Sequence, residues 1–340
     1  MRKAALLLMT LVQLAPTPLR ASVVQQVPLP VGKCVNTGNH LETPSEDANG
    51  QKRLEAADFV RIRAAGFDTV RIPVDWYKHS ASAPPYRIEP KWLDRVDEVV
   101  RQALAAHLHV ILDSHNFNLV HSNPAEGSPW LGEVWRQVAA HFARQPTSQL
   151  WFEIENEPHD KLTNANLMAT LGPALAAIRE SNPDRPVVIG GQNWSGIDSL
   201  ATLDLPDDPH VYATFHYYEP FAFTHQGAGW VNPSPPLGRH YGLPEDKARL
   251  ITDAAKVDAF VARTGRVPFI GESGAFESVP LAERADYLRA ISTSLAPHTS
   301  GLCVWAYTNT FPMWDHVGGH WLPGMLEAIG LPGEKPSKSK

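Results

Sequence analysis

Short runs rich in β-branched and aromatic residues alternate along this chain with segments whose apolar residues recur at helical spacing. This alternation is typical of βαβ units and therefore of a parallel sheet. The β-rich runs are eight in number and cover residues 32–36, 69–73, 110–114, 150–156, 187–191, 211–216, 267–272 and 302–307. The helical segments between them cover residues 54–64, 92–106, 130–143, 167–180, 247–263 and 281–294.

Eight strands with intervening helices over roughly 300 residues predict an α/β fold of the (β/α)8 TIM barrel type. An open doubly wound sheet would usually have a glycine-rich phosphate-binding turn after its first strand, and the sequence has none there. No internal repeat, linker or break in composition indicates a second domain. We therefore expect one barrel domain over residues 23–332. The connection at 219–242 is unusually long, which predicts a functional or mobile loop.

The two ends of the chain differ in character from the barrel segments. Met1, Arg2 and Lys3 precede an apolar stretch over residues 4–14, prolines follow, and Ala21 is a candidate cleavage position. This layout predicts an export signal over residues 1–22, because the apolar part is too short to span a bilayer. No later stretch resembles a membrane span, so we expect a secreted or periplasmic protein without a membrane partner. The tail at 333–340 is expected to be disordered.

Charge and cysteine content narrow the range of partners. A net charge of −6 and a pI near 6.2 give no basic surface that would attract nucleic acid. Separately, we expect the protein to be a monomer. Cys34 and Cys303 could pair in an exported chain, but nothing else resembles a disulfide framework and a fold this long does not need a cross-link. Two buried thiols are therefore favoured over a bridge, although the sequence leaves the pairing open.

Carboxylates lie at the ends of two predicted strands. The fourth strand is followed by Glu157 and the seventh ends in Glu272, and active groups of such barrels lie at the carboxyl ends of strands. Glutamates on nearly opposite strands can face each other at about 5 to 5.5 Å, as a retaining glycosidase requires. One must hold a proton for the leaving oxygen, which needs a raised pKa, and the other must be ionised. Glu153 and Glu155 share the parity of Glu157, but we expect them in buried polar networks below it.

Other strand ends carry side chains that can adjust these carboxyls or bind sugar. Arg71 and Tyr218 are expected to favour the ionised form of Glu272. The indole of Trp305 can stack on a sugar ring, and Asn156 can bond to the hydroxyl beside the anomeric carbon.

The motifs at successive strand ends form an ordered set that is more specific than any single tripeptide. They are Val70-Arg71-Ile72-Pro73, Asp113-Ser114-His115, Asn156-Glu157-Pro158, His216-Tyr217-Tyr218, Gly271-Glu272-Ser273-Gly274 and Trp305. In this order they resemble glycoside hydrolase family 5, from the first strand to the last. The resemblance implies Glu157 as acid/base and Glu272 as nucleophile. It implies that the residues around the cleaved bond are Arg71, His115, Asn156, His216, Tyr218 and Trp305.

The first strand leads into Asn36-Thr37-Gly38-Asn39-His40-Leu41-Glu42, which resembles the opening motif of the family's endoglucanases. This favours endo-hydrolysis of a β-1,4-glucan, with Asn39 as a contact to more distant sugars or as part of the rim packing. Mannan, xyloglucan and β-1,3-glucan stay open as substrates, and so does transglycosylation. A carbohydrate-binding barrel without catalysis is the alternative from another class, but such a protein usually lacks at least one of the two glutamates.

The abundant histidines and tryptophans have simpler interpretations. Among 15 histidines there is no metal-binding spacing, so neither a metal nor another cofactor is expected. Surface or loop positions are expected for His79, His107, His121, His159 and His320. Trp92 and Trp135 are expected in the core. Candidate sugar platforms are Trp76, Trp194 and Trp230.

Overall fold

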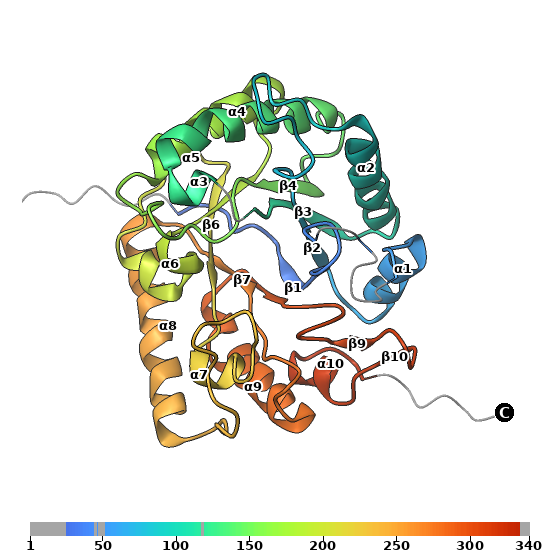
Figure 1. Ribbon diagram of the computed structural model, residues 1–340. Coiled ribbons are helices and arrows are strands. Elements are labelled where there is room, and N and C mark those ends of the chain that lie inside the picture. The colour runs from blue at the N-terminus through green and yellow to red at the C-terminus, as the bar shows by residue number, and fades with distance from the viewer. Residues whose placement is uncertain (1–24, 44–45, 47–51, 117–118, 334–340) are drawn as a thin grey trace, which may run out of the picture.

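The eight predicted strands form a closed parallel barrel in the computed structural model, which describes residues 25–43, 46, 52–116 and 119–333. The strands follow one another around the ring in chain order, as the (β/α)8 prediction requires (Figure 1). They are β1 (Gly32–Asn36), β2 (Thr69–Val74), β3 (His109–Ser114), β4 (Leu150–Glu153), β5 (Val187–Gly190), β6 (Val211–His216), β7 (Phe269–Glu272) and β8 (Gly301–Val304).

Helices surround the strands and cover the outside of the barrel (Figure 1). The longer ones are α1 (Ala56–Ala64), α2 (Pro90–Ala105), α4 (Pro124–His141), α5 (Leu167–Ser181), α8 (Pro244–Thr264) and α9 (Leu281–Ser294). The short elements are α3 (Leu119–Ser122), α6 (Gln192–Ser195), α7 (Phe221–Thr224), α10 (Met325–Ala328), η2 (Ile197–Ala201), η3 (Ala296–His298), β9 (Trp314–Asp315) and β10 (His320–Trp321).

Several element boundaries differ from the prediction. The strands β4 and β8 end three residues early, at Glu153 and Val304, because the chain leaves the sheet there. Helix α4 begins six residues early, at Pro124, and includes Pro129, although proline is normally excluded from helix interiors. Between β5 and β6 the outer layer is formed by the short α6 and η2.

Alternate residues of each strand face two different cores. Val110 and Leu112 of β3 belong to the core between strands and helices, whereas Ile111 belongs to the smaller core inside the barrel. The inner core also contains Trp151 and Phe269. Apolar packing therefore fills the lower barrel, and polar residues collect above it at the carboxyl ends of the strands.

Cys34 and Cys303 form a disulfide, so the expectation of two buried thiols is wrong. The two residues are register partners across the pair of β1 and β8, where the first strand meets the last. Both are fully buried. The bond joins residues that are 269 positions apart in the sequence, and a bridge of this kind is expected to stabilise the fold by about 2–5 kcal/mol.

The predicted export signal at 1–22 lies outside the described residues, and so does the predicted tail at 333–340 apart from Gly333. In the part of the chain that is described, no helix has both the length and the apolar character needed to cross a membrane.

Candidate active site

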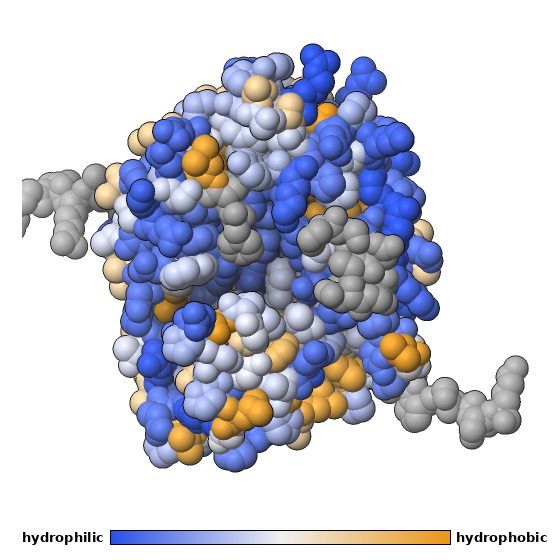
Figure 2. All heavy atoms as spheres, viewed as in Figure 1, coloured by the Kyte–Doolittle hydropathy of each residue, from blue (hydrophilic) through white to orange (hydrophobic). Residues whose placement is uncertain are grey.

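The carboxyl ends of the strands bring the predicted site residues together around one point. Arg71 lies in β2, while His216 and Glu272 are the last residues of β6 and β7. The loops that follow β3, β4, β6 and β8 supply His115, Asn156 with Glu157, Tyr218 and Trp305. The surface of the barrel is hollowed near the middle of this face (Figure 2).

Arg71 is the centre of a buried polar network. Its guanidinium is fully buried and donates to both oxygens of Glu153, at 2.8 and 2.9 Å. It also lies 2.9 Å from Asp113 Oδ2 and donates to Asn156 Oδ1 at 2.7 Å. These acidic neighbours raise the pKa of Arg71 in spite of its burial, so the guanidinium stays charged. Glu153 therefore lies in the network below the rim, where it was predicted.

Glu272 accepts hydrogen bonds from two donors. Arg71 Nη1 lies 2.8 Å from its Oε1, and the Tyr218 hydroxyl lies 2.8 Å from its Oε2. Only 5% of the Glu272 side chain is exposed. A cation and a hydroxyl that both donate to the same carboxylate favour its charged form.

Glu157 faces Glu272 but has different neighbours. Its Oε1 lies 2.9 Å from Nδ1 of His216, which is itself 3.6 Å from Glu272 Oε2. The ligand atoms of these three residues lie within 4.8 Å of one another, so the two carboxyls are close enough to act on one bond. The Glu157 side chain is 15% exposed, and no cationic side chain is among the hydrogen-bond partners that the structure gives for it.

Burial controls the protonation of both carboxyls. It raises the pKa of Glu157, and the positive charge of Arg71 opposes that rise only in part. Burial also raises the pKa of Glu272, which the sequence did not predict, and the neighbouring Glu157 carboxyl adds to that rise. Two coupled carboxyls this close share one proton over a range of pH. The Arg71 and Tyr218 donors favour the charge on Glu272 over the charge on Glu157.

The two histidines of the site are neutral. Burial lowers the pKa of His115 and of His216 to about 4 each. His115 Nδ1 lies 2.9 Å from Asp113 Oδ2, and its Nε2 lies 3.3 Å from the Asn156 amide nitrogen. Burial raises the pKa of Asp113 to about 7. These bonds fix the Asn156 side chain, whose oxygen faces Arg71.

Trp305, Asn39 and Trp194 lie further out around the opening. The Trp305 indole stacks on the His115 ring at 5.6 Å, so it belongs to the central group. The Asn39 amide donates to Thr310 Oγ1 at 3.2 Å, which supports the rim-packing interpretation as much as a sugar contact. Trp194 is 52% exposed, and its amide donates to the carbonyl of Pro158, the residue after Glu157, at 3.0 Å.

Two histidines that were expected at the surface or in loops, His121 and His159, pack against each other beside Glu157. His159 Nδ1 donates to the Glu157 backbone carbonyl at 2.6 Å, and its ring stacks on Trp194 at 5.0 Å. His121 is buried, stacks on His159 at 4.1 Å and lies 2.9 Å from Glu155 Oε1. The surface prediction is wrong for His121. The contact of His159 with Glu157 could have been predicted, because His159 follows Glu157 by only two residues in the sequence.

The other tryptophan predictions divide in the same way. Trp76 is fully buried and is a core residue, so it cannot be a sugar platform. Trp230, on the long connection after β6, is 57% exposed. Its ring packs edge-on against Phe276 at 4.8 Å. Trp135 lies in the core, as predicted.

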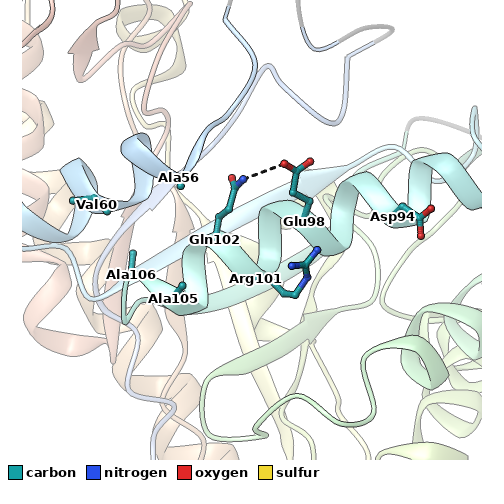
Figure 3. Close-up of a pocket in the computed structure, with 8 residues that line it drawn as sticks. All are labelled: Ala56, Val60, Asp94, Glu98, Arg101, Gln102, Ala105 and Ala106. Carbon is teal, nitrogen blue, oxygen red and sulfur yellow. Dashed lines mark hydrogen bonds between the residues drawn. The ribbon is translucent and has the colours of Figure 1, made fainter.

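Among the described residues, one group of His and acidic side chains is close enough to hold a metal ion, and it is the trio Glu157, His216 and Glu272. That the protein works without a metal ion stays a prediction. A separate pocket between α1 and α2 is lined by residues such as Val60, Glu98 and Arg101 (Figure 3). It lies on the outer wall and contains none of the residues of the site.

A closed (β/α)8 barrel with two facing glutamates above a buried arginine has the architecture of a glycoside hydrolase. The sequence model of the family described as cellulase, glycosyl hydrolase family 5, matches residues 34–310. The chain belongs to this family.

Individual relatives agree with this assignment. Endoglucanase H of Acetivibrio thermocellus is 29% identical over 315 residues, which cover 91% of this chain and 34% of that protein. The chain thus spans about a third of the length of this relative and, at 36%, of cellulase/esterase CelE of the same organism. Solved structures of Thermotoga maritima Cel5A with cellobiose and with mannotriose are 33% identical, cover 88% of this chain and 97% of theirs, and have TM-scores of 0.85 and 0.84.

Proposed function

We propose that the protein is a retaining endo-β-1,4-glucanase in which Glu157 is the acid/base and Glu272 the nucleophile. The observation that carries this proposal is that two carboxyls, with an oxygen of one within 4.8 Å of an oxygen of the other, have unlike neighbours. Arg71 and Tyr218 donate to Glu272, whereas the neutral His216 is the partner of Glu157. A retaining glycosidase needs this spacing and this difference in protonation.

In the first step Glu157 gives its proton to the glycosidic oxygen as the bond from that oxygen to the anomeric carbon breaks. Glu272 attacks the same carbon from the opposite face, and a covalent glycosyl–enzyme ester forms. In the second step Glu157, now ionised, takes a proton from water. The water oxygen bonds to the anomeric carbon and the Glu272 carboxylate leaves, so Glu157 ends the cycle protonated again, with a proton that came from water.

The remaining site residues bind the sugar or hold the two carboxyls. Arg71 and Tyr218 keep Glu272 charged, and His216 orients Glu157. The Asn156 and His115 side chains face the position of the reacting sugar as hydrogen-bonding groups, and Trp305 provides an aromatic surface beside them. Trp194 and Asn39 are proposed contacts to sugar units further along the chain.

The preferred substrate is a β-1,4-glucan, with a β-1,4-mannan as the second candidate. The glucan is supported by the endoglucanases among the relatives and the mannan by the mannotriose complex of Cel5A. A panel of soluble glucan, mannan, xyloglucan and β-1,3-glucan, with sizing of the products, tests this choice. Rapid loss of viscosity with few reducing ends is expected for endo action, and release of cellobiose alone would contradict it.

We also propose that the chain is exported and acts as a monomer. The buried disulfide supports an oxidising compartment, as does the expected signal at 1–22. All groups that the proposed reaction uses come from one chain. Detection of the protein in the culture fluid or periplasm tests export, and size-exclusion chromatography with light scattering tests the monomer.

The roles of the two glutamates are tested by Glu157→Ala and Glu272→Ala, assayed with an activated aryl cellobioside and azide. Each variant should lose most turnover. Azide should rescue the first through the normal ester and give a β-glycosyl azide, whereas it should rescue the second by direct displacement and give the α-azide. The opposite pairing of anomers would exchange the roles, and wild-type turnover in either variant would refute the proposal.

A further inference from the structure

The ladder between β6 and β7 is irregular at the reacting groups. Phe215 pairs with Ile270, but His216 pairs with Glu272, so Gly271 is an extra residue in β7. A Cβ at Gly271 would lie 2.6 Å from Thr214 Oγ1 and 2.9 Å from His216 Nε2, so only glycine fits. Such bulges turn a side chain towards a site, but they also interrupt the regular hydrogen bonds of the sheet.

A side chain from outside the sheet supplies hydrogen bonds just beyond this bulge. The Tyr287 hydroxyl, on α9, donates to the Tyr217 carbonyl at 3.0 Å and accepts from the Ser273 hydroxyl at 3.4 Å. The Tyr217 amide in turn donates to the Glu272 carbonyl at 2.9 Å. Tyr287 therefore connects the residue after the end of β6 to the residue after the end of β7.

Tyr287 is rigidly placed for this role. Its side chain is fully buried, and its ring packs against Tyr241 at 5.2 Å and Phe223 at 5.7 Å. Ser273 is also fully buried. Water therefore does not compete for these bonds, and each should hold its two backbone segments in a fixed relation.

We propose that Tyr287 is a positioning residue that fixes the Glu272 carboxylate relative to Tyr218 and His216. The inference rests on the proposed function of Glu272. Tyr287 does not touch the reacting atoms. It acts through Tyr217, which lies between His216 and Tyr218, and through Ser273, which follows Glu272.

The test uses Tyr287→Phe, which keeps the ring and removes only the hydroxyl. The enzyme is inactivated with 2,4-dinitrophenyl 2-deoxy-2-fluoro-β-cellobioside, in which Glu272 attacks the anomeric carbon and dinitrophenolate leaves. We expect the maximal inactivation rate constant to fall about fivefold, while the binding constant of the inhibitor stays unchanged. The amplitude of the dinitrophenolate burst counts folded sites, so partial unfolding lowers the amplitude and not the rate constant.

Two further variants complete the experiment. Tyr241→Phe removes a neighbouring hydroxyl without a bond to either strand end and should behave like the wild type. Ser273→Ala should slow inactivation in the same direction by a smaller factor. An unchanged rate constant in Tyr287→Phe, or an equal fall in Tyr241→Phe, overturns the positioning role. A wild type that hydrolyses no glucan and takes up no label overturns the proposed function itself, and the role with it.

Discussion

Glu272 and Glu157 have the same side chain, but the two sides of the site treat it differently. On the Glu272 side, a buried arginine and a tyrosine donate directly to the carboxylate, and 5% of the side chain is exposed. On the Glu157 side, a neutral histidine is the partner, and 15% is exposed. Burial raises the pKa of both, so hydrogen-bond donors decide which carboxyl carries the charge. We therefore propose that the role of each glutamate is set by its neighbours.

The largest effect is expected from Glu272→Gln, which keeps the shape of the side chain and removes the attacking charge. We expect kcat to fall by about 10⁴-fold or more. The loss should be equally severe for soluble glucan and for 2,4-dinitrophenyl β-cellobioside, because both need the nucleophile. Near-normal turnover of the aryl substrate would show that the charge on this side is not required.

Glu157→Gln should behave differently from Glu272→Gln, because it removes the proton donor and not the nucleophile. On glucan, loss of the proton donor is expected to lower kcat by about 10²- to 10⁴-fold. The first step with the dinitrophenyl cellobioside should be almost unaffected, since dinitrophenolate leaves without a proton. The rate of the dinitrophenolate burst measures this first step. A burst slowed as much as in Glu272→Gln would contradict the difference between the two glutamates.

Tyr218→Phe removes one donor from the charged carboxylate. A hydrogen bond to a charged group contributes about 1.5–3 kcal/mol, so kcat/KM should fall about 10- to 100-fold. Without this donor the pKa of Glu272 should rise further. Activity requires the ionised form, so the acidic limb of the pH profile should move to higher pH. Tyr217→Phe loses a hydroxyl that donates to Asp253 at 2.9 Å and serves as the control, whose acidic limb should stay in place.

The smallest effect is expected at the rim on the Glu157 side. Trp194→Ala should raise KM for oligosaccharides by about two- to tenfold, because one stacking surface is lost, and should leave kcat nearly unchanged. Trp194→Phe retains a ring and should recover most of the affinity. A large fall in kcat in Trp194→Ala would mean that the stack on His159 controls Glu157 itself.

The strand pattern predicted the barrel, and the residue types at the strand ends, together with the family resemblance, predicted which side chains gather at its carboxyl face. Apart from Arg71, which lies inside β2, each central side chain follows or ends a buried strand, and a barrel brings all such ends to one face. The disulfide was missed because pairing of Cys34 with Cys303 depends on the register across the last seam of the ring. Two isolated cysteines contain no information on that register.

Contacts between residues far apart in the chain could not be predicted from the sequence either. The hydroxyl of Tyr287 comes from a helix that reads only as amphipathic, and its partners lie 70 and 14 residues away. Glu157 has a φ of +49°, a left-handed backbone that strand periodicity does not predict. The rise in the pKa of Glu272 depends on its full enclosure, which is a property of the folded loops.

The central claim is that Glu272 forms the covalent bond to the sugar, and trapping the ester tests it most directly. The protein is labelled with 2,4-dinitrophenyl 2-deoxy-2-fluoro-β-cellobioside, digested with protease and sequenced by tandem mass spectrometry. The account predicts one added fluorocellobiosyl group per molecule, on Glu272. A label on Glu157 or on any other side chain would contradict it.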